Sequence, residues 1–155
     1  MPNASNKRIQ RDIAKLSEKE DANVEHIEDD TIHCMIHGPE DTPYEGLKWK
    51  IVISFPESYP FNSPSVGFID NIWHPNVDYE SGSVCLNVLN QSWSPIYSGI
   101  LILDTFLPQL LTYPNPDDPL NEEAAEMYIN NIEEYNIECR KRSEKPGVYD
   151  FGRTL

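Results

Sequence analysis

The sequence predicts an α+β fold: an N-terminal helix, a four-stranded antiparallel meander, a long irregular loop, a central helix and C-terminal helices. Three observations support this prediction. Apolar residues recur at helical spacing near the N-terminus, short apolar or alternating runs separated by turn residues follow, and helical patterns return after about residue 96. Strands grouped between separate helical segments are typical of α+β domains rather than of alternating α/β folds.

The first element is an amphipathic helix over about residues 6–19. Ile9, Ile13 and Leu16 recur at the spacing of one helix face. The other faces carry the cations Lys7, Arg8, Arg11 and Lys15. Exposed charges of this kind often form only a solvated surface.

Strands are expected over residues 24–27, 31–37, 48–55 and 65–68. Short turn segments separate these runs, which favours an antiparallel meander. His33 and His37 lie two residues apart on one strand, but no Cys or carboxylate at a supporting spacing accompanies them. We therefore expect no metal site.

The second half of the chain is expected to be helical. Residues 96–111 contain too many apolar side chains for one helix face, which predicts a buried central helix that Pro108 kinks or divides. Asn121 and Asn131 are candidate N-caps of two further helices. Cys139 is expected to be structural, and residues 146–155 are expected to form a frayed tail.

Composition limits the possible functions. A chain of 155 residues suits a single domain, 1–155, with its own core. The net charge of −14 argues against nucleic-acid binding. The sequence has no run of 18 apolar residues and no signal-peptide pattern, and its three cysteines are an odd number. We therefore expect no membrane segment, and a protein with free thiols in the cytoplasm, the nucleus or both.

The stretch that most directly indicates chemistry runs from residue 74 to residue 93. It contains Cys85 in a segment rich in turn residues, with no clear helix or strand pattern. From Ile51 to Cys139 the chain has no Lys or Arg but thirteen carboxylates, so no cation near in sequence activates this thiol, and no CxxC motif is present. Such a thiol suits a group that arrives already activated, by exchange from another thioester. The negative middle of the chain should attract basic partners.

Four short motifs extend this interpretation. Cys85 follows His74-Pro75-Asn76 by nine residues and precedes Trp93-Ser94-Pro95; upstream lies Tyr59-Pro60-Phe61-Asn62-Ser63-Pro64 and downstream Pro114-Asn115-Pro116-Asp117-Asp118-Pro119-Leu120. Their order and spacing resemble the ubiquitin-conjugating enzyme family over about residues 6–142. Details around residues 107–116 look closest to the H-type ubiquitin-conjugating enzymes.

The resemblance implies a reaction and a set of site residues. Cys85 would accept the C-terminal carboxyl of ubiquitin as a thioester and pass it to a substrate lysine. Asn76 matches the family asparagine that stabilises the oxyanion or orders the active-site loop, although an Asx turn after Pro75 would also explain it. Asp118 matches the acid that assists the incoming lysine, and His74 matches a structural histidine. Asn87 departs from the Asp that many members carry, which puts an electrostatic role at that position in doubt.

The resemblance also implies partners. The activating enzyme, which uses ATP, would contact Lys7, Arg8 and Arg11; a ubiquitin ligase would contact Phe61, Pro95 and Ile96. The H-type likeness implies a multisubunit ligase of the glucose-induced-degradation type, and the acidic surface suits basic protein substrates. No bound cofactor is expected. Single exposed apolar residues are common, so partial burial alone could explain Phe61, Pro95 and Ile96.

Three other functions fit the sequence less well. Conjugation of another modifier such as SUMO would be accompanied by an insertion before the tryptophan and by a more basic surface, and the sequence has neither. A non-catalytic ubiquitin-binding member would lack the cysteine. An unrelated acidic interaction domain leaves the four motifs unexplained. The substrate and the linkage of any ubiquitin chain are not legible in the sequence.

Overall fold

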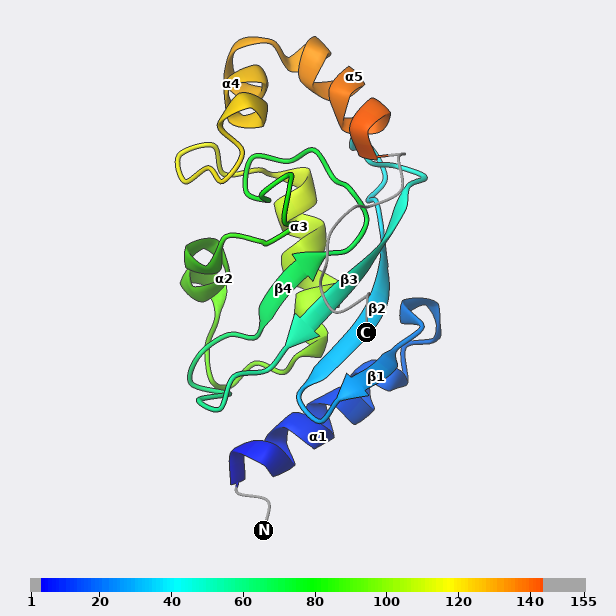
Figure 1. The fold of residues 1–155 in the computed structure, drawn as a ribbon, viewed down its shortest axis with the longest axis vertical. Coiled ribbons are helices and arrows are strands. Elements are labelled where there is room, and N and C mark those ends of the chain that lie inside the picture. Colours follow the sequence, from blue (N-terminus) through cyan, green and yellow to red (C-terminus); the bar gives the residue numbers. More distant parts are fainter. Residues whose placement is uncertain (1–3, 144–155) are drawn as a thin grey trace.

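The computed structural model describes residues 4–143, and it has the expected α+β architecture (Figure 1). The tail predicted at 146–155 lies outside the described residues. The strands are β1 (Glu25–Glu28), β2 (Thr31–His37), β3 (Lys48–Ser54) and β4 (Ser65–Phe68). The helices are α1 (Ala4–Ser17), a 3₁₀ turn η1 (Glu20–Ala22), α2 (Leu86–Ser92), a π-helical segment η2 (Ile102–Phe106), α3 (Leu107–Thr112), α4 (Glu122–Asn130) and α5 (Ile132–Ser143).

The four strands form one antiparallel sheet in the order β1-β2-β3-β4, as the meander prediction requires. Their bounds differ from the predicted ones by one residue at most. Ile53 of β3 pairs with Ile32 of β2 on one side and with Val66 of β4 on the other. The three side chains are buried, so this register aligns apolar positions of three strands.

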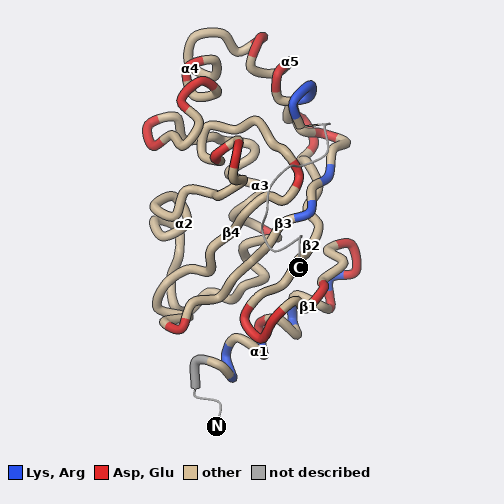
Figure 2. Tube along the Cα trace, in the orientation of Figure 1, with Lys and Arg blue, Asp and Glu red and all other residues tan. Residues whose placement is uncertain are grey.

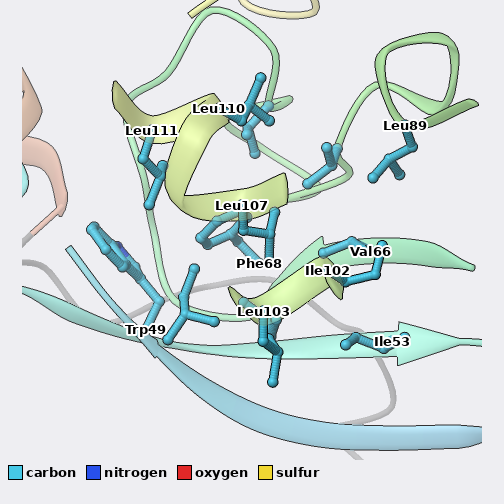
Figure 3. Close-up of a cluster of buried hydrophobic side chains, with 14 of the residues drawn as sticks. Trp49, Ile53, Val66, Phe68, Leu89, Ile102, Leu103, Leu107, Leu110 and Leu111 are labelled. Carbon is cyan, nitrogen blue, oxygen red and sulfur yellow. The ribbon is translucent and has the colours of Figure 1, made fainter. Parts of the chain in front are cut away.

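The central helix covers one face of the sheet and forms the core with it. Figure 3 shows Leu103 and Leu107 of the helix close to Trp49 and Phe68 of the sheet, and all four side chains are buried. Burial of side chains this large contributes roughly 1.5–3 kcal/mol each. The core therefore holds the chain segments that carry the thiol on a rigid support.

We expected Pro108 to kink or divide the central helix. The helix continues through Pro108 without a break. The helix instead changes type: η2 is π-helical, and α3 begins one residue before Pro108. Proline has no N–H to donate to the carbonyl of Asp104 four residues earlier. Leu107 donates its N–H to the carbonyl of Ile102, five residues earlier, which is the π-helical pattern.

The remaining helices lie at the two ends of the molecule. α1 buries Ile9, Ile13 and Leu16 as predicted, at the end opposite to α4 and α5 (Figure 1). Asn121 caps α4 by accepting a hydrogen bond from the N–H of Ala124 (3.0 Å), and Asn131 accepts one from Glu134 (3.2 Å). Both cap predictions are confirmed. Within residues 4–143, no helix has the length and apolar character needed to cross a membrane.

Candidate active site around Cys85

Cys85 stands where the long loop ends and α2 begins. The Cys85 N–H donates to the carbonyl of Asn76 (2.9 Å), and the Cys85 carbonyl accepts from the N–H of Leu89 (3.2 Å). A β-bridge between Val77 and Val84 closes the loop just before the cysteine. The loop therefore returns on itself and holds the cysteine backbone beside its own first residues. The Cys85 residue is 7% exposed.

The helix that follows Cys85 was not predicted from the sequence, because residues 74–93 have no clear helix pattern. α2 spans only seven residues, Leu86–Ser92, and buries only Val88 and Leu89. A pattern this short cannot be distinguished from an apolar turn in the sequence, and its two asparagines are poor helix formers. Packing of Val88 and Leu89 against the core holds the helix in place.

Asn76 is fully buried and joins two loops with one side chain. Its Nδ2 donates to the carbonyls of Asn115 (2.7 Å) and Asp118 (3.1 Å), and its Oδ1 accepts from the N–H of Asn115 (2.9 Å). Its own carbonyl accepts from Cys85. Asn76 thus lies between the thiol segment and the segment of Asp118, and its amide group is already bonded within the chain.

His74 is fully buried and uses both ring nitrogens. Nδ1 accepts from the N–H of Asn76 (3.0 Å), so Nε2 carries the proton and donates to the carbonyl of Leu110 (2.8 Å). Burial lowers the pKa of His74 to about 4. A neutral ring with both nitrogens engaged fits the structural role expected from the resemblance.

Asp118 and Asn87 lie at the surface of the site. Asp118 is partly buried, and its carbonyl is held by Asn76, which leaves the carboxylate group outside that contact. Asp117 is exposed, and its N–H donates to the Oδ1 of Asn115 (3.1 Å), as in an Asx turn. Asn87 is exposed on the first turn of α2. The structure brings Cys85, Asn76 and Asp118 into one region, whereas their roles stay predictions.

The other two thiols have different surroundings. Cys34 lies within β2 and is 1% exposed; burial raises its pKa to about 12. Cys139 lies on α5 and is fully buried against Tyr44 and the carbonyl of Trp73; burial raises its pKa to about 11. All three cysteines are free thiols. Since thiolates are the nucleophiles, neither buried thiol suits acyl transfer at neutral pH.

The residues expected to contact a ligase form exposed turns. Phe61 is 76% exposed and Ile96 is 87% exposed, and Pro95 is exposed beside Ile96. The two turns lie side by side, because the indole N–H of Trp93 donates to the carbonyl of Pro60 (2.7 Å). Large apolar side chains this exposed commonly mark a protein contact.

The three cations assigned to the activating enzyme do not form one uniform face. Lys7 and Arg11 are exposed on α1, as predicted. Arg8 instead turns toward the chain: its Nε lies 3.0 Å from Oδ2 of Asp12, and its guanidinium donates to the carbonyls of Pro95 (3.4 Å) and Tyr97. The role of Asp12 was not predicted from the sequence. A carboxylate three residues after Ile9 lies on the buried helix face, and this position could have indicated a buried ion pair.

Charge is segregated over the fold. In Figure 2 acidic residues lie along α4, at the start of α5, in the loop before α4 and along β1, whereas the Lys and Arg residues within residues 4–143 lie on or just after α1, on β3 and at the end of α5. No group of three His, Cys, Asp or Glu side chains within residues 4–143 is placed to hold a metal ion. Near Cys85, the loop of Asp117 and Asp118, which Asn76 joins to the cysteine segment, carries two carboxylates.

Comparisons with known proteins agree with this geometry. The model of the family described as "Ubiquitin-conjugating enzyme" matches residues 8–143. The chain is 46% identical over 141 residues to Ubiquitin-conjugating enzyme E2 6 of Arabidopsis thaliana, covering 90% of this chain and 76% of that protein. It is 41% identical over 144 residues to Ubiquitin-conjugating enzyme E2-24 kDa of Saccharomyces cerevisiae, covering 92% and 66%. A solved candidate ubiquitin conjugating enzyme from Plasmodium yoelii superposes with a TM-score of 0.80 at 29% identity, covering 95% and 97%.

Proposed function

Because this chain belongs to the ubiquitin-conjugating enzyme family, we propose that Cys85 accepts the C-terminal carboxyl of ubiquitin as a thioester and transfers it to a substrate lysine. The donor is the ubiquitin-activating enzyme, and a ubiquitin ligase brings the substrate. The observation that carries the assignment is the position of Cys85 among the three thiols. Cys85 precedes a helix beside the Asp118 loop and is 7% exposed, whereas Cys34 and Cys139 are 1% and 0% exposed within a strand and a helix, where burial raises their pKa values.

The reaction consists of two acyl transfers. In the first, the sulfur of Cys85 forms a bond to the ubiquitin carbonyl carbon, and the thiol of the activating enzyme leaves. In the second, the lysine nitrogen forms the amide bond, the thiol of Cys85 leaves, and the amine loses a proton. ATP is consumed upstream by the activating enzyme, so the proposed reaction needs no resident cofactor. The chain must mainly position the two reactants.

The proposed division of roles follows from the contacts. Asn76 could turn its amide toward an oxyanion only by giving up its bonds to Asn115 and Asp118. We therefore assign Asn76 to ordering of the loop. The Asp118 carboxylate then holds the acceptor amine and favours loss of its proton in the transition state. Asn87 is a neutral hydrogen-bonding group at the rim.

The proposal extends to partners in general terms. Phe61, Pro95 and Ile96 form the surface for a ligase, such as a multisubunit ligase of the glucose-induced-degradation type. The acidic groups around the site favour substrates with basic surroundings of the acceptor lysine. Lys7 and Arg11 on α1 are exposed and can reach the activating enzyme.

The test is formation of the thioester. Incubated with activating enzyme, ATP and ubiquitin, the chain should give a conjugate that reductant removes. Cys85→Ser should give an oxygen ester that resists reductant and is cleaved by alkali, whereas Cys34→Ala and Cys139→Ala should keep the thioester. A reductant-sensitive conjugate on Cys85→Ser would contradict the assignment. Parallel reactions with other ubiquitin-like modifiers decide whether ubiquitin is the modifier.

A further inference from the structure

Two exposed turns, residues 58–61 and 94–97, are joined to α1 by an ion pair between the partly buried Arg8 and the buried Asp12; we call them the docking turns. The first turn is closed by the bond from the Phe61 N–H to the Ser58 carbonyl (2.8 Å) and the second by the bond from the Tyr97 N–H to the Ser94 carbonyl (2.9 Å). In Figure 1 the β3–β4 connection runs beside the chain that follows α2, at the end of the molecule where α1 lies.

Asp12 is the centre of this connection. Its residue is 1% exposed, and its Oδ2 accepts from both the Nε of Arg8 (3.0 Å) and the hydroxyl of Tyr59. Burial, with the bond to Asp12 as a second cause, raises the pKa of Tyr59, so that its hydroxyl stays a donor. Tyr59 belongs to the first docking turn. Asp12 therefore anchors the first docking turn to α1 through the hydroxyl of Tyr59.

Arg8 extends the connection to the second turn. Its guanidinium donates to the carbonyls of Pro95 and Tyr97, which flank the 87% exposed Ile96. The guanidinium also lies 5.5 Å from the ring centre of Tyr59, and the Tyr59 ring packs on Trp93 (5.6 Å). The rigid fork of an arginine can bind the carboxylate and the two carbonyls at once, whereas a lysine ammonium is a single point charge.

We propose that the buried Asp12 and the partly buried Arg8 form a positioning pair that sets the spacing of the two docking turns and thereby the affinity for a ubiquitin ligase. The expected effect on ligase affinity rests on the proposed function, whereas the expected effect on the geometry of the docking turns does not. Asp12 is too buried to contact any partner, so an effect of Asp12 on ligase binding must pass through the turns. Arg8 acts within the chain, unlike the exposed Lys7 and Arg11.

The test uses Asp12→Asn, which keeps the shape of the side chain but removes its charge, and Arg8→Lys, which keeps the charge but removes the fork. Lys15→Gln, exposed on the same helix and outside the surface assigned to the activating enzyme, is the matched control. Native-state amide hydrogen exchange reports each turn through the Tyr97 and Phe61 N–H groups. We expect exchange of these amides to become about 10-fold faster in both variants, while amides of the β2–β3 ladder keep their rates.

A purified ubiquitin ligase that accelerates discharge of the charged wild-type chain gives the second readout. In both variants the ligase concentration for half-maximal stimulation should rise about 3- to 10-fold, with the maximal ratio of assisted to unassisted discharge retained. The double variant should show less than the product of the two effects. Unchanged exchange at Tyr97 and Phe61, equal acceleration over the whole sheet, or an effect of Lys15→Gln as large as that of Asp12→Asn would overturn the proposal. Failure of the wild-type chain to form a thioester would instead contradict the proposed function and leave the exchange result to be judged by itself.

Discussion

Single side chains in this site act mainly by holding backbone. The side-chain amide of Asn76 hydrogen-bonds to the backbone of Asn115 and Asp118. Both ring nitrogens of His74 hydrogen-bond to the backbone, one to Asn76 and one to Leu110. Such bonds are strong inside a protein because losing one leaves a buried polar group without a partner. Of Cys85, Asn76, His74 and Asp118, this leaves the Cys85 thiol and the Asp118 carboxylate for the proposed chemistry.

Asp118 gives the sharpest prediction at this scale. Asp118→Ala should leave charging nearly intact, because transthiolation involves no amine, and should slow discharge onto free lysine by about 10²-fold or more. The loss should shrink as the pH rises towards the lysine pKa of about 10.4, where more of the acceptor is already neutral. Single-turnover discharge measured from pH 7 to pH 10 checks this.

Asp117→Ala is the control, since Asp117 is exposed and its N–H already takes part in the turn. Parallel loss of charging and discharge in both variants would make the acid structural. Normal discharge by Asp118→Ala at neutral pH would contradict the catalytic role.

His74 predicts a pH dependence of stability. Its folded-state pKa of about 4 lies below its ordinary value of 6.5, so the unfolded chain binds more protons than the folded one between these values. The free energy of unfolding should therefore fall as the pH decreases through this window, by about 3 kcal/mol from His74. Urea denaturation at pH 7 and pH 4 should show a larger loss for the wild type than for His74→Gln.

The imidazole itself offers an independent check. Nitrogen NMR should find a neutral ring with the proton on Nε2 and no titration between pH 7 and pH 5. A His74 ring that titrates near pH 6.5 would contradict the buried assignment.

At the scale of elements, prediction succeeded where turn residues or a sustained period mark an element. The strands β2 and β4 have the predicted bounds because turn residues separate the apolar runs, and α1 buries the predicted residues because a period of 3.6 extends over its 14 residues. Prediction failed at α2, whose two buried side chains are held by packing against the core, and at the π-helical turn before Pro108, where backbone hydrogen bonding rather than hydrophobicity decides.

The candidate site was likewise predicted only in part from the sequence. The motifs around Cys85 and Asp118 could be located in the sequence, and the structure brings them together through Asn76. The connection from Asp12 through Arg8 to residues 95–97 joins positions more than eighty residues apart. No local pattern indicates such a bond, and the family resemblance grouped Arg8 with Lys7 and Arg11.

At the scale of the whole molecule, charge distribution becomes a functional property. The chain has a net charge of −14, and the cations of the part that the structure describes are concentrated on and just after α1, on β3 and near the end of α5. A partner with acidic groups is repelled by most of the surface and attracted by α1. The orientation of the encounter is therefore set before contact, and its rate should depend on ionic strength.

Lys7→Glu combined with Arg11→Glu tests this. Charging by the activating enzyme should be slower than in the wild type, by about 10-fold at low salt, and the difference should narrow as salt shortens the screening length to about 10 Å near 0.1 M. Lys48→Glu with Lys141→Glu makes the same change in net charge at exposed positions on β3 and α5. If net charge alone mattered, both double variants would slow charging equally. If α1 is the contact, the control pair should charge close to the wild-type rate at every salt concentration, and initial rates at 20–500 mM salt, a range of roughly 20 to 4 Å in screening length, distinguish the two outcomes.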